Sequence, residues 1–159
     1  MTTQPQKPTI TLQSVKIHHG LSQETHAFTA KVYVDGVYFA DAGNAGHGGM
    51  TDIHAPRTSK RKETLDQMGD RVGRFNAAER DLNAIIAATS PVKYVIEGTD
   101  YRCQLDDIVD QLVDDRENTR KCKATLARKL MVARADGLYT LKSKPTPEHV
   151  AGATAEFTE

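Results

Sequence analysis

Three side chains that can hold a metal ion lie close together in a glycine-rich segment of the chain. They are His47, Asp52 and His54, which fall within eight residues. Imidazole nitrogens and carboxylate oxygens are common ligands of zinc, and three of them in one loop can surround a single ion. The segment has no HExxH sequence and no paired cysteine ligands, so the pattern is not specific to metal sites. A zinc site is the first of three interpretations of this segment.

The same segment carries glycines that allow backbone N–H groups to converge on an anion. Gly46, Gly48 and Gly49 can take the positive φ values that such a nest requires, and Thr51 and Arg57 follow closely in sequence. The segment lacks the Gly-Lys-Ser or Gly-Lys-Thr ending of a phosphate-binding loop. In the third interpretation, which the sequence favours, the glycines serve only the geometry of a turn and a histidine caps or packs.

No catalytic arrangement can be assigned from the sequence. There is no Ser-His-Asp or Cys-His order, and no pair of carboxylates lies in apolar surroundings. The two cysteines, Cys103 and Cys122, are too few for a disulfide scaffold, and neither neighbours a histidine in sequence. We therefore expect reduced thiols in an intracellular protein. Because no catalytic arrangement can be assigned, the sequence favours a function that is not enzymatic.

Charge is unevenly distributed along the chain, although the formal net charge is zero. A net charge of zero argues against a generally basic nucleic-acid-binding protein and against an acidic mimic of DNA. Residues 97–117 carry eight acids and two bases, whereas residues 118–144 carry eight bases and one acid. The favoured interpretation is that these two surfaces pair with each other, which contributes little stability.

The alternative interpretation is a basic patch that contacts phosphate groups or an acidic protein surface. This patch combines bases of residues 118–144 with a second basic cluster near residue 60. The candidate binding residues are Arg57, Lys60, Arg61, Lys62, Arg120, Lys121 and Lys123, together with Gly46, Gly48 and Gly49 of the glycine-rich segment.

A β-hairpin is expected to lead into the glycine-rich segment. The Asp35-Gly36 pair is typical of a two-residue turn in which both residues take positive φ. A turn there pairs Val32 with Phe39 and Ala30 with Asp41, so that one face of the hairpin is apolar. That face carries Phe28, Ala30, Val32, Val34, Val37 and Phe39, and the opposite face carries Lys31, Tyr33, Tyr38 and Ala40.

Two further strands and a second hairpin are expected elsewhere. Residues 10–17 alternate as a strand with a bulge at Ser14 and Val15, and pair beside the first hairpin. Residues 92–96 form a short strand. A turn at Asp136-Gly137 makes the second hairpin, which pairs Val132 with Leu141 and Arg134 with Tyr139.

Three helices are predicted from apolar residues at three- and four-residue spacing. The longest begins at an N-cap at Thr58 or Ser59 and ends near residue 90. Gly69 and Gly73 either allow close approach of a neighbouring element or break this helix, and the two readings have equal weight. Two shorter charged helices follow at residues 105–117 and 119–129. The apolar stripe of the long helix contains Leu65, Met68, Val72, Phe75, Leu82 and Ile86.

Together these elements predict a single α+β domain over residues 10–143, between flexible tails at residues 1–9 and 144–159. Its antiparallel sheet has about four to five strands, supplied by the first strand and the two hairpins. The long helix and the two shorter charged helices pack against it. The sequence has no apolar N-terminal run, so we expect neither a signal peptide nor a membrane span.

Parts of the chain resemble a group of small uncharacterised proteins carried by phages and bacterial mobile elements. Residues 21–36 and 46–49 are similar to the hairpin and the following GxGG loop of that group, and residues 105–113, LDDIVDQLV, to its acidic helix. The tails and the long helix do not match. The resemblance implies an accessory protein, and many such proteins act by binding.

We therefore expect stoichiometric binding to a protein, most simply as an inhibitor of a host defence system of the anti-CRISPR kind, in the host cytoplasm. The first alternative is a virion or assembly component of a phage. The second is a metal- or nucleotide-dependent enzyme built on the His47 segment. The expected partners are a host or phage protein complex, nucleic acid at the basic patch, or another copy of the chain, but not a membrane.

Overall fold

The computed structural model describes residues 6–57, 63–90, 92–96, 99–134, 137–141 and 146–147. Most of the two predicted tails lies outside these ranges. The chain divides into two compact units, Met1–Asp114 and Asp115–Glu159, where the sequence predicts one domain.

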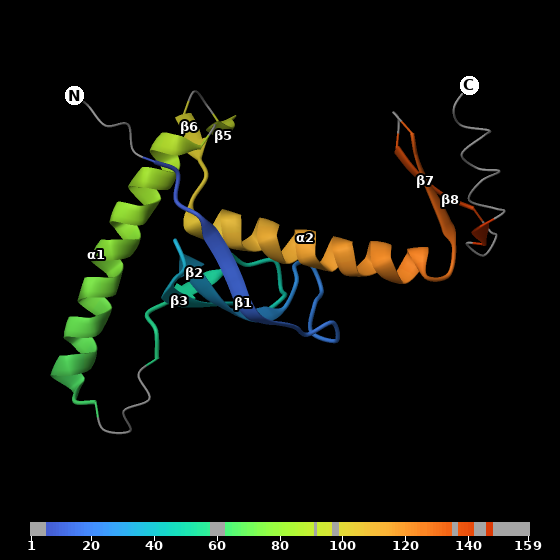
Figure 1. Cartoon of the computed structure of the whole chain (residues 1–159). Helices are drawn as coiled ribbons and strands as arrows, with labels where there is room; N and C mark the ends of the chain where they lie inside the picture. Colours follow the sequence, from blue (N-terminus) through green and yellow to red (C-terminus); the bar gives the residue numbers. More distant parts are fainter. Residues whose placement is uncertain are drawn as a thin grey trace. The chain divides into compact units, whose positions relative to one another are not determined.

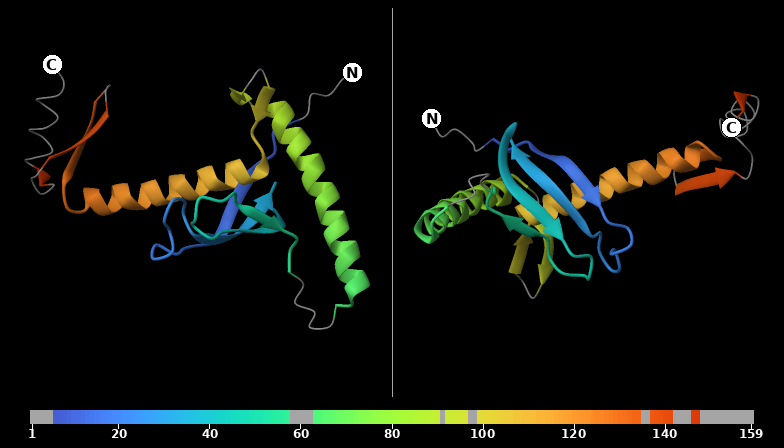
Figure 2. Two further views of the ribbon diagram at one scale, coloured as in Figure 1. Left: turned by 180° about the vertical axis from the view of Figure 1, so that it is seen from behind. Right: turned by 90° about the horizontal axis from the view of Figure 1, so that it is seen from below.

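The first unit is built on a four-stranded antiparallel sheet with the strand order β1-β2-β3-β4. Its strands are β1 (Ile10–Ile17), β2 (Phe28–Val34), β3 (Val37–Asn44) and β4 (Asp52–His54), shown in Figures 1 and 2. Strands β2 and β3 form the predicted hairpin, because Asp35 and Gly36 take φ values of 48° and 81°. The α+β class and the predicted place of the first strand beside this hairpin are confirmed.

The register of the hairpin differs from the prediction beyond its first pairs. Val32 pairs with Ala40 and not with Phe39, so the predicted partner of Ala30, Asp41, is displaced as well. The cause is a bulge at Phe39, which adds one residue to β3. The predicted pairs Val32–Phe39 and Ala30–Asp41 are therefore wrong.

The bulge changes which side chains reach the core. Ala40 and Ala42 are buried, although Ala40 is predicted on the outer face, whereas Val37 is 70% exposed. Phe39 still reaches apolar surroundings, because its ring lies 5.5 Å from that of Phe75. On the outer face, the rings of Tyr33 and Tyr38 lie 5.5 Å apart, as the sequence predicts.

Strand β1 contains the predicted bulge. Its pairing with β2 shifts between Gln13 and Lys16, and Ser14 takes a positive φ of 51°. The shift allows Ile10 and Leu12 before the bulge, and Ile17 after it, to be half-buried against the same core.

Helix α1 (Leu65–Thr89) begins later than the sequence predicts. Its N-cap is Thr64, whose hydroxyl accepts from the Gln67 N–H at 3.3 Å, while the Gln67 side chain accepts from the Thr64 N–H at 3.2 Å. This capping box satisfies two free donors at the helix start. The helix therefore begins at Thr64, which has the required glutamine three residues later, and the predicted N-cap at Thr58 or Ser59 is wrong. Thr58 and Ser59 themselves lie outside the described residues.

Only the second half of the predicted α1 stripe is buried. Phe75, Leu82 and Ile86 belong to the core, whereas the residues of the first half are exposed. The helix runs unbroken through Gly69 and Gly73, and no described atom lies within 4 Å of a Cβ placed at either glycine. Among the described residues, therefore, neither of the two predicted roles of these glycines is seen. The exposed part of the stripe consists of Leu65, Met68 and Val72.

Helix α2 (Leu105–Leu126) replaces the two short charged helices of the prediction. The change of charge near Glu117 does not interrupt it, because no glycine or proline lies there and Glu117 pairs with Arg120 one turn later. Leu105, Val109 and Val113 belong to the same core as the buried residues of α1 and of the sheet. None of the described helices is long and apolar enough to cross a lipid bilayer.

Two separate hairpins complete the described chain. Strands β5 (Val92–Ile96) and β6 (Thr99–Arg102) form one two-stranded sheet, and β7 (Leu130–Arg134) and β8 (Gly137–Leu141) form another. Neither joins the central sheet, which for β7 and β8 is contrary to the prediction. In the second hairpin Val132 pairs with Tyr139 and Arg134 with Gly137, so the predicted register is wrong. The reason is that Gly137 already belongs to β8.

Candidate functional site

One asparagine side chain holds together the glycine-rich segment between β3 and β4. The Asn44 Oδ1 accepts from the Gly46 N–H at 2.8 Å and from the Thr25 hydroxyl at 3.0 Å. Its Nδ2 donates to the Gly49 carbonyl at 2.9 Å and to Thr51 Oγ1 at 3.3 Å. Asn44 is only 8% exposed, so this buried amide is satisfied by four bonds within the first unit.

The geometry of this segment does not favour an anion nest. The Gly46 N–H is engaged by Asn44, and the Gly48 N–H donates to Thr25 Oγ1 at 3.3 Å. The Glu24 carboxylate lies where a Cβ at Gly48 would be, so a negative charge already faces the loop. Gly46 and Gly48 take φ values of 88° and 83°, which agrees with the favoured interpretation that these glycines serve turn geometry.

The predicted metal ligands are displayed on the surface but are not gathered. His47 is exposed, and its Nδ1 lies 3.3 Å from Gln23 Oε1. Asp52 and His54 are exposed on β4, where they line a separate hollow of about 400 Å³. Within the part of the chain that the structure describes, no three His, Cys, Asp or Glu side chains are placed to hold one ion. The geometry gives no support to the zinc interpretation.

All four of the described basic candidates are exposed, and two of them pair within their own helix. Arg57 is exposed. In the second unit Arg120 binds the buried Glu117 carboxylate through two bonds of 2.9 and 2.7 Å, and Lys121 lies 4.0 Å from it. Lys123 is exposed in the last turn of α2. Lys60, Arg61 and Lys62 lie outside the described residues.

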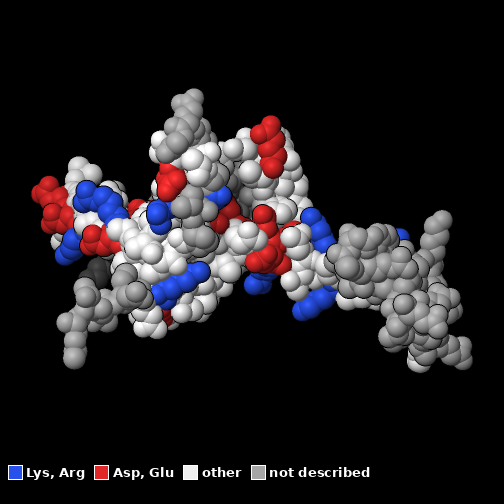
Figure 3. Space-filling model, turned by 90° about the horizontal axis from the view of Figure 1, so that it is seen from above, with Lys and Arg blue, Asp and Glu red and all other residues white. Residues whose placement is uncertain are grey.

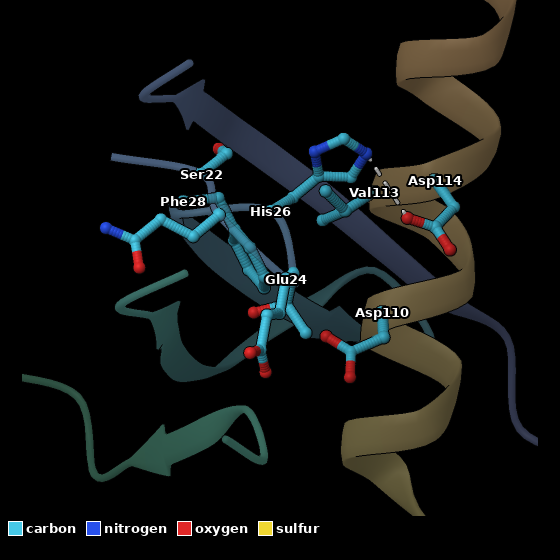
Figure 4. A pocket seen from close by; sticks show the side chains of 9 residues that line it. Ser22, Glu24, His26, Phe28, Asp110, Val113 and Asp114 are labelled. Carbon is cyan, nitrogen blue, oxygen red and sulfur yellow. Dashed lines mark ion pairs between the residues drawn. The ribbon is translucent and has the colours of Figure 1, made fainter. Parts of the chain in front are cut away.

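A hollow that the sequence analysis did not predict lies between residues 22–28 and α2, as Figure 4 shows. Its volume is about 390 Å³. Phe28 and Val113, exposed by only 2% and 1%, supply apolar lining. Carboxylates approach from both sides, and we call the site the acidic hollow. Its lining residues are Ser22, Gln23, Glu24, Thr25, His26, Phe28, Asp110, Val113 and Asp114.

Two contacts position the α2 carboxylates of the acidic hollow. The Thr51 hydroxyl donates to the Asp110 carboxylate, which ties α2 to the segment held by Asn44. The His26 Nε2 lies 3.5 Å from Asp114 Oδ1, the pair marked by a dashed line in Figure 4. Asp110 and Asp114 are therefore each held in place by a contact with a side chain from outside α2.

Negative charge accumulates along this side of α2. Asp106, Asp110 and Asp114 are spaced four residues apart, so they share one side of the helix. Burial raises the pKa of Asp110, and the neighbouring charges of Asp106 and Asp114 raise it further, although the Thr51 bond opposes this. A cation is the ligand that such a site attracts.

Glu79 of α1 extends this like-charge interaction. Burial raises its pKa from the ordinary value of 4.5, and the charge of Asp106 raises it further, whereas His54 lowers it. Because the folded pKa lies above the unfolded one, Glu79 favours the folded state only while it is protonated. That contribution is complete below about pH 4.5 and is lost as the pH rises through the folded pKa.

We predict that Glu79→Gln raises the melting temperature at pH 7, on the order of 2 °C. The gap in melting temperature should narrow as the pH falls through the folded pKa of Glu79, and it should close below about pH 4.5, where Glu79 is protonated in both the folded and the unfolded chain. Thermal unfolding followed by circular dichroism at several pH values measures this. Asp81→Asn, at an exposed acid of the same helix, is the control. A gap that widens towards low pH contradicts the prediction.

No family model, curated protein or solved structure matches this chain. The resemblance to proteins of phages and mobile elements therefore stays a prediction.

Proposed function

We propose that this chain is a non-enzymatic binding protein whose acidic hollow receives an arginine or lysine side chain of a protein partner. The observation that carries this proposal is the combination of apolar and acidic lining. A long basic side chain can lay its methylene groups on Phe28 and Val113. Its charged head then lies among the carboxylates of Glu24, Asp110 and Asp114.

The electrostatics of the hollow support a cationic occupant. Burial and like charges make the ionised form of Asp110 costly in the free protein. A guanidinium or ammonium group would relieve that repulsion and satisfy the remaining carboxylate oxygens. Asp106 lies one turn earlier on α2 and extends the negative field beyond the hollow, whereas Asp107 is paired with Lys93. A partner with several basic side chains would therefore bind better than one with a single cation.

Proteins that act on nucleic acids present such basic surfaces, because they must neutralise phosphate groups. A host defence nuclease is a protein of this kind. The proposed role is thus stoichiometric inhibition of a host defence system, in which the acidic side of α2 occupies part of the surface that would hold nucleic acid. Two observations support this role: the negative charge of the hollow and the resemblance of the sequence to phage-borne proteins.

The test is capture of the partner from host extract by the tagged full chain and by a variant of the hollow. The variant carries Glu24→Gln, Asp110→Asn and Asp114→Asn. We expect it to capture at least about 10-fold less partner than the unchanged chain, equivalent to about 1.4 kcal/mol. Capture by the unchanged chain should also weaken as salt rises, because the contact is ionic.

The control variant removes the same number of charges at exposed acids away from the hollow. It carries Asp52→Asn, Asp81→Asn and Asp100→Asn, and we expect it to capture the partner as the unchanged chain does. Equal capture by the hollow variant and the unchanged chain would overturn the proposal. If mass spectrometry finds the chain in purified phage particles, an assembly role replaces inhibition.

A further inference from the structure

A second, larger hollow adjoins the acidic hollow, with a volume of about 620 Å³. We call it the wide hollow. Asp110 and Asp114 line both hollows, so these two residues mark the boundary between them. All of the described lining residues belong to the first unit. They are Lys7, Pro8, Ile10, Ser90, Lys93, Cys103, Asp107, Ile108, Asp110, Gln111, Leu112 and Asp114.

The wide hollow crosses the outer side of α2. Leu112 follows Asp110 by two residues, which is about 200° around a helix, so the two residues lie on opposite sides of α2. On the arc between them that faces outwards Gln111 is exposed, whereas Val109 is buried on the arc that faces the core. The wide hollow therefore has an acidic end next to the acidic hollow, and a second end at residues 7–10.

The second end of the wide hollow is apolar. Ile10, Cys103 and Ile108 are half-buried and pack against the core. Pro8 and Leu112 are half-buried beside them. Because these side chains also line the hollow, part of their apolar surface stays open to water. A large apolar side chain placed at this end would cover that surface, which is favourable.

Charge varies along the wide hollow. Asp110 and Asp114 supply negative charge at the acidic end. In the middle, the charge of Asp107 is compensated by an ion pair with Lys93, and at the apolar end Lys7 is exposed. Charges of both signs, separated by uncharged surface, also appear on the face of the molecule in Figure 3. Charge complementarity therefore favours a partner segment that has a basic side chain at one end only.

We propose that one extended segment of the partner binds both hollows, with a basic side chain in the acidic hollow and a large apolar side chain at the apolar end of the wide hollow. This inference rests on the proposed function and narrows the class of partner. Side chains on one face of an extended segment are two or four residues apart, which is about 7 or 13 Å. A helix with its side chains is about 10–12 Å wide, so only the spacing of four residues reaches across α2.

The first test is an NMR titration of the ¹⁵N-labelled full chain with three peptides, each made in both sequence orders. The first peptide carries arginine and leucine four residues apart. The second has alanine in place of the leucine, and the third has the leucine two residues from the arginine. All three should shift the amide signals of residues 22–28. Only the first should also shift those of Ile10 and Ile108, and it should bind at least about 5-fold more tightly than the other two.

The second test removes apolar surface from the wide hollow. Leu112→Ser should weaken binding of the first peptide at least about 5-fold and leave binding of the second peptide unchanged. An unchanged affinity for the second peptide also shows that the variant is folded. Leu126→Ser, at an exposed leucine in the last turn of the same helix, is the matched control and should bind both peptides as the unchanged chain does.

The outcomes separate this inference from the proposed function. Equal affinities for the first and second peptides, with residues 22–28 shifted by both, would overturn the inference and leave the proposed function intact. If no peptide shifts residues 22–28, both are overturned. If deletion of residues 1–5 shifts the Ile108 signal without any peptide, the start of the chain itself fills the wide hollow, which also overturns the inference.

Discussion

Replacing Gly46 with alanine is expected to lower the free energy of unfolding by about 3 kcal/mol. Gly46 takes a φ of 88°, which costs an L-amino acid about 1–2 kcal/mol. A Cβ there would also lie 2.5 Å from the Leu21 carbonyl oxygen and 2.9 Å from the Ala27 Cβ. Both contacts involve positions that move only with the backbone, so the loop must shift. Urea denaturation followed by circular dichroism measures the loss.

The neighbouring glycines provide matched comparisons. At Gly49 a Cβ would meet nothing within 4 Å, so Gly49→Ala should change stability by less than about 0.5 kcal/mol. The loss of stability in Gly48→Ala should lie between the losses in Gly46→Ala and Gly49→Ala. The φ of Gly48 is also positive, but the crowded atom is the mobile tip of Glu24. If Gly46→Ala and Gly49→Ala have equal stability, the described conformation of this segment is wrong.

Asn44→Ala is expected to have a similarly large effect, a loss of about 3 kcal/mol. The substitution removes four hydrogen bonds, each contributing about 1 kcal/mol net, and leaves buried partners unsatisfied. The Gly46 N–H loses its acceptor, so its hydrogen exchange should become at least about 10-fold faster. Denaturation and amide exchange by NMR measure the two effects.

Asn76→Ala is the control for this change, since Asn76 is exposed on α1. This substitution should change the free energy of unfolding by less than about 0.5 kcal/mol. An unchanged exchange rate at Gly46 in the Asn44 variant would contradict the role of this side chain as the centre of the segment.

The hairpin was predictable because its signal is local. The Asp35-Gly36 pair sets the turn, and strict alternation marks the two strands. The bulge at Phe39 was not predictable in the same way. Phe39 and Ala40 are both acceptable on an apolar face. What decides between them is the ring of Phe75, which lies far along the chain and packs on Phe39.

The helices show a similar division. The apolar spacing correctly predicted the existence of α1 and the core residues Phe75, Leu82 and Ile86. The same spacing does not reveal that only the second half of the α1 stripe packs against the sheet. The change of charge near Glu117 suggested a boundary, but charge alone does not end a helix when no glycine, proline or cap is present.

The glycine-rich segment was found in the sequence, but its surroundings were not. Three glycines and two histidines are visible as a motif, whereas the role of Asn44 depends on Thr25, which lies on another loop. The acidic hollow was missed for the same reason. In the sequence, Asp110 and Asp114 stand out only as members of the acidic run of residues 97–117. Nothing in the sequence brings residues 22–28 beside them.

The most direct test of the proposed function is an NMR titration of the ¹⁵N-labelled chain with a short peptide that contains one arginine. The matched peptide carries citrulline, which has nearly the same shape as arginine but no charge. The acidic hollow predicts that the arginine peptide shifts the amide signals of residues 22–28 and 110–114, and that the citrulline peptide does not. Equal shifts with both peptides, or arginine-dependent shifts that leave these two segments unchanged, would contradict it.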